Sequence, residues 1–459
     1  MGPDGRTQTP SPAALEPVLS GDLGHGAVRR LAIDPLGHGL GELLGPCAAD
    51  GPSWTWELLR SKFKPSRKLT AYYRVSPASD AATGLPEQLR DRHVAVTWFA
   101  DRQPAPRPVP SPAEPPPSSA RLSAVSEDGR ILVRVSPDDP VMPQLARLTD
   151  RRHLAVLIGE RSGRAVDADR LAVDTVRYRP GQRHVLRVLR DGDAWVYVKT
   201  DRVRSGARAV AAAAFLSDRV PEGARGAAVA LPLEYDAEDA AALWWSAPGV
   251  PLSRLLATRP AAALRTVAQT GRALRVLHDS PSGPASLPRR GGPEDVHTEA
   301  RETLRAGEHV AALLPDLGRT HEQVAAQVVE ELDRVPGEAP VLCHGDFKSD
   351  NLVVDGGRLT ILDLDRTGWA DPAKDLGKFL VDLRWWCRDP GRAAALTVAF
   401  QAGYGSCDQA RWARARLFAA LFQLKLTARR CPVHDARWGT QVRTRTLEAV
   451  ETLRVARGA

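Results

Sequence analysis

Cysteine is scarce in this chain, which limits the possible disulfide bonds and cysteine-bound metal sites. Only five cysteines occur in 459 residues. They are widely spaced and odd in number: Cys47, Cys343, Cys387, Cys407 and Cys431. This pattern argues against a disulfide framework and against a zinc site, and it fits a reducing compartment.

Long hydrophobic runs are also missing. No stretch is apolar enough to span a bilayer. The first residues, Met-Gly-Pro-Asp-Gly-Arg, lack the apolar core of a signal peptide. We therefore expect a cytoplasmic protein without a membrane partner.

A basic run with interleaved aromatic residues is the third missing feature. The net charge is +8, but the arginines are scattered along the chain with acidic residues between them. No zinc-finger spacing occurs either, so we expect no nucleic-acid partner. A basic surface also suits nucleotides and other anionic ligands. With 43% hydrophobic and 26% charged residues, the composition is that of a globular protein.

The most informative segment that is present is His344-Gly-Asp346-Phe-Lys348-Ser-Asp-Asn351, followed by Asp363 within an apolar run. Phosphoryl transfer needs a carboxylate that orients the acceptor hydroxyl, and it needs hard oxygen ligands for Mg²⁺. Asp346 is the candidate catalytic base, and Lys348 could offset charge on the transferring phosphate. Asn351 and Asp363 are the candidate magnesium ligands.

Neighbouring residues are expected to have structural roles. We expect His344 to anchor the backbone of this loop rather than to act as an acid or base. Asp371 and Asp375 are expected to cap the next helix and brace the loop, because an Asp just before a helix satisfies its free N–H groups.

This segment resembles the catalytic loop of the aminoglycoside phosphotransferase and choline kinase family, and residues 363–376 match the spacing of that family's metal-binding segment. The resemblance covers residues 170–455. It implies an α+β, bilobal protein-kinase-like fold with a small β-rich N-lobe and a mostly helical C-lobe. It also implies ATP (or GTP) and Mg²⁺ as cofactors. Lys348 is a departure, since the family often has His there, and it resembles the loop of Ser/Thr protein kinases.

Two segments in the N-terminal half look like copies of one unit. They lie within residues 61–99 and 176–199, and each reads as aromatic, base, Pro, small residue, β-run and a second alternating strand. The first copy has Thr97 near the position that Lys199 holds in the second. We interpret the first copy as a degenerate N-lobe-like unit. The alternative is that any two β-hairpins look alike.

The second copy carries the candidate nucleotide-binding residues. Lys199 ends an alternating strand, like the strand lysine that holds ATP phosphates in kinases. Arg179 and Gly181 lie in a turn that would cover the phosphates, with a plain hairpin turn as the alternative. Trp245 would line the adenine pocket at a hinge, with packing as the alternative. The helix expected at 207–219 offers no Glu to pair with Lys199, so the partner of this lysine stays open.

The expected organisation has four parts. An additional N-terminal β-containing cap module occupies residues 1–101, and a proline-rich linker follows at 102–120, because such a stretch favours extended geometry. The N-lobe with its hinge then covers 121–249, and the helical C-lobe covers 250–459. A cap before the kinase lobe is similar to the arrangement in actinobacterial maltokinases. Oligomeric state stays open.

These observations predict a phosphotransferase that moves the γ-phosphate to a hydroxyl of a small-molecule acceptor. The resemblance implies an aminoglycoside, amino sugar, sugar or choline-like alcohol. Were the acceptor cationic, its binding carboxylates would come from the helical lobe. Asp365, Asp382 and Asp389 are the candidates, with surface solvation as the alternative for the last two.

Two other functions stay open. One is a Ser/Thr kinase that acts on a precursor peptide in ribosomal natural-product biosynthesis, which Lys348 and the N-terminal module both favour. The other is a kinase-like binding protein, which the missing helix Glu favours. The retention of Asp346, Asn351 and Asp363 argues against the binding protein.

Overall fold

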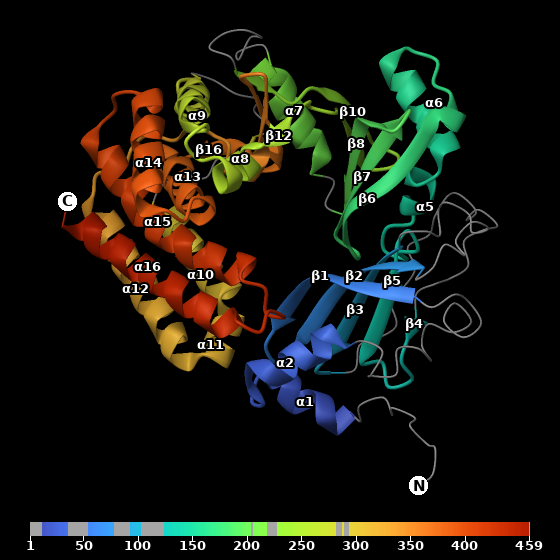
Figure 1. Cartoon of the computed structure of the whole chain (residues 1–459), viewed down its shortest axis with the longest axis horizontal. Helices are drawn as coiled ribbons and strands as arrows, with labels where there is room; N and C mark the ends of the chain where they lie inside the picture. The colour runs from blue at the N-terminus through green and yellow to red at the C-terminus, as the bar shows by residue number, and fades with distance from the viewer. Residues whose placement is uncertain are drawn as a thin grey trace.

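The computed structural model describes residues 12–34, 54–77, 92–101, 124–202, 205–217, 227–280, 287–288 and 293–458. The cap sheet, a second sheet above it and a large helical lobe beside both are visible in Figure 1. The linker expected at 102–120 lies outside the described residues. No helix in the described ranges is both long and apolar enough to cross a membrane.

The cap module is an antiparallel sheet in the order β1-β2-β3-β5-β4, with α2 in contact with β1 and β2. Its elements are α1 (Pro12–Ser20), α2 (Gly24–Ile33), β1 (Trp54–Lys64), β2 (Lys68–Pro77), β3 (Arg92–Phe99), β4 (Ala124–Val125) and β5 (Ile131–Val135). Alternate residues of β2 such as Leu69, Ala71 and Tyr73 are buried, as expected for a strand that packs one face on helices. Tyr73 also donates a hydrogen bond of 2.5 Å to the carbonyl of Ala32 in α2.

The cap sheet continues past residue 101, into the segment that sequence reasoning assigned to the N-lobe. Val94 of β3 pairs with Val135 of β5, so the second half of this sheet comes from residues 124–135. The pairing of β3 with β5 could not be predicted from local sequence, because these strands are far apart in the chain and tertiary contacts decide which strands pair.

The N-lobe sheet has the order β10-β11-β8-β7-β6, and Figure 1 shows it above the cap sheet. Its elements are α5 (Leu145–Leu148), α6 (Arg151–Ser162), β6 (Leu171–Arg179), β7 (Arg183–Arg190), β8 (Asp193–Asp201), α7 (Gly206–Ser217), β10 (Pro232–Asp236) and β11 (Ala241–Trp245). Apart from the numbering, this order is that of the cap sheet, with β6-β7-β8-β11-β10 in place of β1-β2-β3-β5-β4. In the two sheets Thr97 pairs with Thr70 and Lys199 pairs with Val185. Thr70 and Val185 are each the third residue of their strand, so Thr97 and Lys199 occupy corresponding positions in the two sheets. A repeated unit requires this correspondence, and the repeat itself stays a prediction.

The C-lobe is mostly helical. Its helices are α8 (Leu252–Thr258), α9 (Leu264–His278), α10 (Pro293–Ala306), α11 (Glu308–Leu313), α12 (Pro315–Arg334), α13 (Pro372–Trp386), α14 (Pro390–Tyr404), α15 (Gln409–Arg430) and α16 (Trp438–Arg457). Its short strands are β9 (Ala227–Val229), β12 (Val250–Pro251), β13 (Val341–Cys343), β14 (Leu352–Asp355), β15 (Arg358–Ile361) and β16 (Gly368–Ala370). The α13 and α15 helices pack on each other in the largest hydrophobic core of the described structure.

The cap is joined to the C-lobe by a shared hydrophobic core. Val28 of α2 belongs to the same buried cluster as Val310 of α11, Leu317 of α12 and Trp438 of α16. Burial of apolar side chains is the main favourable term in such association. The cap is therefore packed against the C-lobe, and its sheet has a fixed position relative to that lobe.

Candidate active site

The loop from His344 to Asn351 is fixed at both ends by short strands. It leaves β13, which pairs with β16, and it enters β14, which pairs with β15. Gly345 has φ +77°, and a Cβ there would lie 2.4 Å from the carbonyl oxygen of Arg366. Only glycine combines this backbone conformation with so close an approach.

Asp375 of α13 holds the beginning of the loop. Its carboxylate accepts hydrogen bonds from the backbone N–H of His344 at 2.6 Å and of Gly345 at 2.9 Å. His344 in turn contacts the carbonyl of Leu362 through Nε2 at 2.8 Å. The structural roles expected for Asp375 and His344 are therefore the ones observed.

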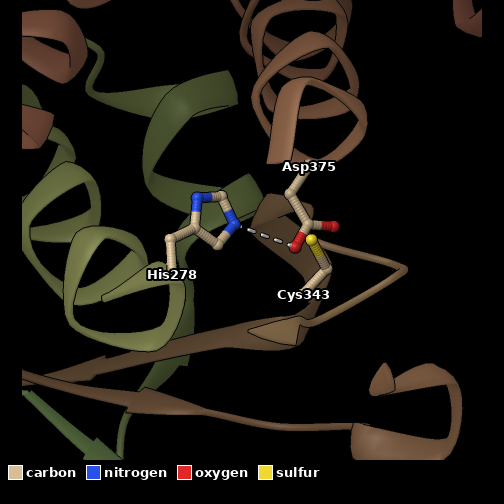
Figure 2. A group of neighbouring side chains, drawn as sticks. All are labelled: His278, Cys343 and Asp375. Carbon is tan, nitrogen blue, oxygen red and sulfur yellow. Dashed lines mark ion pairs between the residues drawn. The ribbon is translucent and has the colours of Figure 1, made fainter. Parts of the chain in front are cut away.

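Figure 2 shows the same carboxylate beside His278 of α9 and Cys343 of β13, with His278 Nε2 at 3.5 Å from Asp375 Oδ2. Their donor atoms lie within 4.8 Å of one another. All three residues are buried, and burial raises the pKa of the Cys343 thiol well above its usual value, so this sulfur stays protonated. The Cys343 thiol donates to the carbonyl of Ala370 at 3.5 Å, and Asp375 already accepts from two N–H groups of the loop, so we describe the group as a brace for the loop.

Asp346 lies between two lysines. Lys348 Nζ is 2.6 Å from one carboxylate oxygen, and Lys378 of α13 forms an ion pair with the other. Burial alone would raise the pKa of Asp346, but Lys378 and Lys348 outweigh burial and hold this pKa well below its ordinary value. The carboxylate is consequently ionised at any pH at which the protein would work.

Lys378 is a candidate functional residue that sequence reasoning missed. It is buried, and it follows Asp375 by three residues on α13. Asp382, four residues further, accepts a hydrogen bond of 2.7 Å from the N–H of Ser349 and forms an ion pair of 2.7 Å with Arg430. Residues at these spacings share one face of a helix, so one face of α13 holds the loop at three points. The spacing of Asp375, Lys378 and Asp382 at i, i+3 and i+7 was the sequence signal that could have predicted a charged helix face beside the loop.

The two candidate metal ligands both present oxygen atoms near Asp346. The Nδ2 of Asn351 donates a hydrogen bond of 3.0 Å to the carbonyl of Asp346, which leaves its Oδ1 free to bind a cation. Asp363 has φ +59°, a conformation that non-glycine residues rarely adopt and that is found at functional sites. Burial opposes ionisation of Asp363, but Lys199 lowers its pKa. Such hard oxygen donors suit Mg²⁺.

The structure answers the open question of the partner of Lys199. Its Nζ lies 2.5 Å from Asp363 Oδ1 and 2.5 Å from Asp365 Oδ2. Asp365 also forms an ion pair of 3.0 Å with Arg183 of β7. Both carboxylate partners of Lys199 thus come from the segment after β15. Asp365, expected among acceptor-binding candidates, is occupied by these two cations.

Arg179 and Gly181 lie in the hairpin between β6 and β7. The N–H of Gly181 donates a hydrogen bond of 2.6 Å to Asp139, which follows the cap sheet. Burial, together with the nearby Arg177 and Arg60, lowers the pKa of Arg179 to about 10, so this side chain stays cationic at neutral pH. The hairpin is therefore tied to the cap and carries positive charge.

Trp245 lies on the opposite face of β11 from the strand lysine. Ala242 pairs with Lys199 and Trp244 pairs with Tyr197, so Trp244 shares the face of Lys199 because side chains alternate along a strand. Trp245 packs instead against Trp195, with ring centroids 5.8 Å apart. The structure does not bring Trp245 together with the other candidate nucleotide-binding residues.

Asp371 and Asp389 cap helices. Asp371 accepts a hydrogen bond of 2.9 Å from the N–H of Ala373 at the start of α13, and Asp389 accepts one of 2.8 Å from Arg392 at the start of α14. Asp371 thus has the capping role expected from its position, and Asp389 caps the next helix from an exposed position.

Comparison with known proteins gives a family. The model of the phosphotransferase enzyme family matches residues 163–418, which is more than half of the chain. A search of curated proteins found no match.

Solved structures similar to this chain include three kinases. A choline/ethanolamine kinase family protein from Mesorhizobium loti is 19% identical and has a TM-score of 0.43, with 62% of this chain and 93% of that chain covered. Aminoglycoside phosphotransferase APH(3'')-Id from Streptomyces rimosus is 24% identical and has a TM-score of 0.39, with 59% and 98% covered. Spectinomycin phosphotransferase APH(9)-Ia is 15% identical and has a TM-score of 0.45, with 67% and 98% covered.

The family match runs from the end of α6 to the middle of α15, and it contains the strand lysine, the loop and the oxygen donors described above. The fold agrees with this match, since the matched residues form a β-rich N-lobe and a helical C-lobe. The chain belongs to the phosphotransferase enzyme family.

Proposed function

We propose that the protein transfers the γ-phosphate of ATP or GTP to a hydroxyl group of a small molecule, with Mg²⁺ as the metal. The observation that carries this proposal is the ionised Asp346, held between Lys348 and Lys378 and next to the oxygen donors of Asn351 and Asp363. Phosphoryl transfer depends mainly on positioning and on electrostatic stabilisation, and these residues supply both.

Asp346 would orient the acceptor hydroxyl and receive its proton. Because Lys348 and Lys378 hold its pKa low, Asp346 is a weak base, and its larger contribution is to align the hydroxyl oxygen with the phosphorus. Lys348 would also offset negative charge on the phosphoryl group. Mg²⁺, when bound by Asn351 and Asp363, would neutralise charge on the phosphates.

Lys199 would contact the phosphates of the nucleotide. In the structure its ammonium group is shared between Asp363 and Asp365. Were Asp363 to hold a metal ion, Asp365 would remain as the partner of Lys199. The missing helix Glu therefore does not count against nucleotide binding.

A Ser/Thr kinase acting on a precursor peptide is the second candidate. The contact between Lys348 and Asp346 supports it, because the loops of protein kinases have a lysine at this position. A cytoplasmic location belongs to either proposal, since nucleoside triphosphates are present there.

The first experiment is a thermal-shift measurement with ATP and GTP, each with and without Mg²⁺. We expect a metal-dependent rise in Tm for the wild type and loss of that rise in Asp363→Asn. An Asp355→Asn variant, with its exposed carboxylate at the end of β14, is the matched control. Absence of any shift with both nucleotides would contradict the proposal and favour a kinase-like binding protein.

A further inference from the structure

The cap sheet has one face packed on helices and a second face that carries cations. Arg60 and Lys62 of β1 are separated by Ser61, and they pair with Tyr72 and Thr70 of β2. Ser61 is buried, whereas Arg60 and Lys62 are only partly covered or exposed. Because alternate residues of a strand point to opposite faces, Arg60 and Lys62 lie on the face away from Ser61.

Arginines of the N-lobe stand opposite this face. Strands β3 and β6 are in contact, and Asp139 fixes the hairpin that contains Arg179. Burial raises the pKa of Tyr72, and the positive charges of Arg60, Arg179 and Arg177 act in the opposite direction. These side chains therefore lie within electrostatic range of one another.

The C-lobe adds two more arginines. Ser61 contacts His434 at 2.8 Å, which places β1 beside the end of α15, where Arg429 lies. Burial and Arg366 lower the pKa of Arg429, and Asp346 acts in the opposite direction. Arg429 also acts electrostatically on Lys62, so it lies within electrostatic range of both the cap and the carboxylate of Asp346.

We call these side chains the basic cluster: Arg60, Lys62, Arg177, Arg179, Arg366 and Arg429. No member forms an ion pair with a carboxylate among the described residues. The carboxylates of Glu299 and Glu302 lie near Arg429. Both form ion pairs with Lys425 of α15 instead. Desolvation, followed by Lys64, Arg60, Arg179 and Arg429, lowers the pKa of Lys62 to about 8. Such mutual repulsion is relieved when an anion binds.

The basic cluster differs from the other cations of the site. Lys199, Lys348 and Lys378 all contact carboxylates of the catalytic machinery, and they serve the nucleotide and the base. Arg60 and Lys62 come from a different module and have no such partner among the residues that the structure describes.

We propose that the acceptor is an anion, a small hydroxyl compound that carries a phosphate or carboxylate group, and that Arg60, Lys62 and Arg429 bind this group. The inference rests on the proposed function. It places the acceptor between the cap sheet and Asp346, and it gives the cap a role in choosing the substrate. The alternative of a cationic acceptor is less favoured, since its candidate carboxylates Asp365 and Asp382 are held by Lys199, Arg183 and Arg430.

The first test is a titration of the protein with pyrophosphate after saturation with AMP-PNP and Mg²⁺, so that the nucleotide site is filled. We expect saturable binding that weakens about 10- to 100-fold in Arg60→Ala and in Lys62→Ala, because each loses a charge-assisted contact. Arg60→Lys should retain most of the affinity. Arg454→Ala removes an exposed arginine that pairs with Glu451 on α16, and it should bind as the wild type does.

Two results of this titration would overturn the proposal: no saturable binding of pyrophosphate, or the same affinity in the wild type, Arg60→Ala and Lys62→Ala. Failure of AMP-PNP to bind would instead contradict the proposed function. In that case binding of pyrophosphate that depends on Arg60 but not on Lys199 would still show an anion site at the cap.

The second test compares turnover of glucose, glucosamine and glucose 6-phosphate, which share a hydroxyl framework and differ in charge. We expect the highest kcat/KM for the phosphorylated compound, with a rise in its KM in Lys62→Ala and little change in kcat. A higher kcat/KM for glucosamine would overturn the proposal. If none of the three sugars is turned over, the titration with pyrophosphate decides whether the cap binds an anion.

Discussion

Asp346 contacts two lysines, and at the scale of single residues this arrangement sets its chemistry. The carboxylate is stabilised as an anion, so in the proposed reaction it would hold a hydroxyl in place better than it would remove a proton. The sequence allowed Asp346, Asn351 and Asp363 to be predicted because their spacing is local. It did not reveal Lys378, whose contact with the loop depends on how α13 packs.

We predict that Asp346→Asn lowers kcat roughly 10²- to 10⁴-fold, since it removes the orienting carboxylate. Nucleotide binding should persist, because Lys199 and Asp363 are unchanged. The measurement is steady-state turnover beside a nucleotide-binding titration, with Asp355→Asn as the control. Full turnover in Asp346→Asn would show that another group orients the acceptor.

Lys378→Met should change the pH dependence of the reaction. Without this lysine the pKa of Asp346 rises toward its ordinary value, because the nearest cation that favours the anion is gone. The acid limb of kcat/KM should therefore move to higher pH. The check is a pH profile of the variant and the wild type, and an unshifted acid limb with a uniform loss of rate would indicate a structural role only.

At the scale of elements, the packing of α9 on α14 depends on a close backbone approach. A Cβ on Gly271 of α9 would lie 2.3 Å from the carbonyl oxygen of Phe400 and 2.6 Å from the N–H nitrogen of Tyr404 in α14. The helices themselves follow from sequence periodicity, but the pairing of one helix with another does not.

Gly271→Ala should destabilise the protein by roughly 1–3 kcal/mol, because the added methyl group forces the two helices apart. Gly439→Ala in α16 is the matched control, since a Cβ there has no neighbour within 4 Å. Alanine usually favours a helix over glycine by up to about 1 kcal/mol, so the control should be neutral or stabilising. Denaturant unfolding of both variants distinguishes these outcomes, and equal stability would contradict the packing argument.

At the scale of the whole molecule, the sequence predicted two lobes and a cap but not how they meet. The cap sheet is completed by residues 124–135, and Lys199 finds its carboxylate at Asp365, far along the chain. Both features depend on tertiary contacts between distant segments. The cap docks on a core that includes Trp438, whose ring lies 5.9 Å from that of His309.

We predict that stability falls as the pH drops from about 6.5 toward 4. Burial, with a smaller effect of His321, lowers the pKa of His309 to about 4, and burial lowers the pKa of His321 to about 4. The unfolded chain binds protons at these histidines below its pKa of about 6.5 while the folded protein does not, so each adds a slope of up to about 1.4 kcal/mol per pH unit.

Thermal unfolding at pH 7, 6 and 5 tests this linkage. The paired variant His309→Gln with His321→Gln should flatten the dependence of Tm on pH relative to the wild type. An identical slope in both proteins would assign the pH dependence to other groups.

The contacts of Asp375, Lys378 and Asp382 with the loop make α13 sensitive to an insertion or deletion of residues. Asp375 and Asp382 are seven residues apart on one helix, and each residue of a helix adds a rotation of about 100° and a rise of about 1.5 Å. A single inserted or deleted residue between them would turn Asp382 away from Ser349 while Asp375 stayed at His344. A change in the number of residues in this stretch of α13 would therefore break the contact of either Asp375 or Asp382 with the loop.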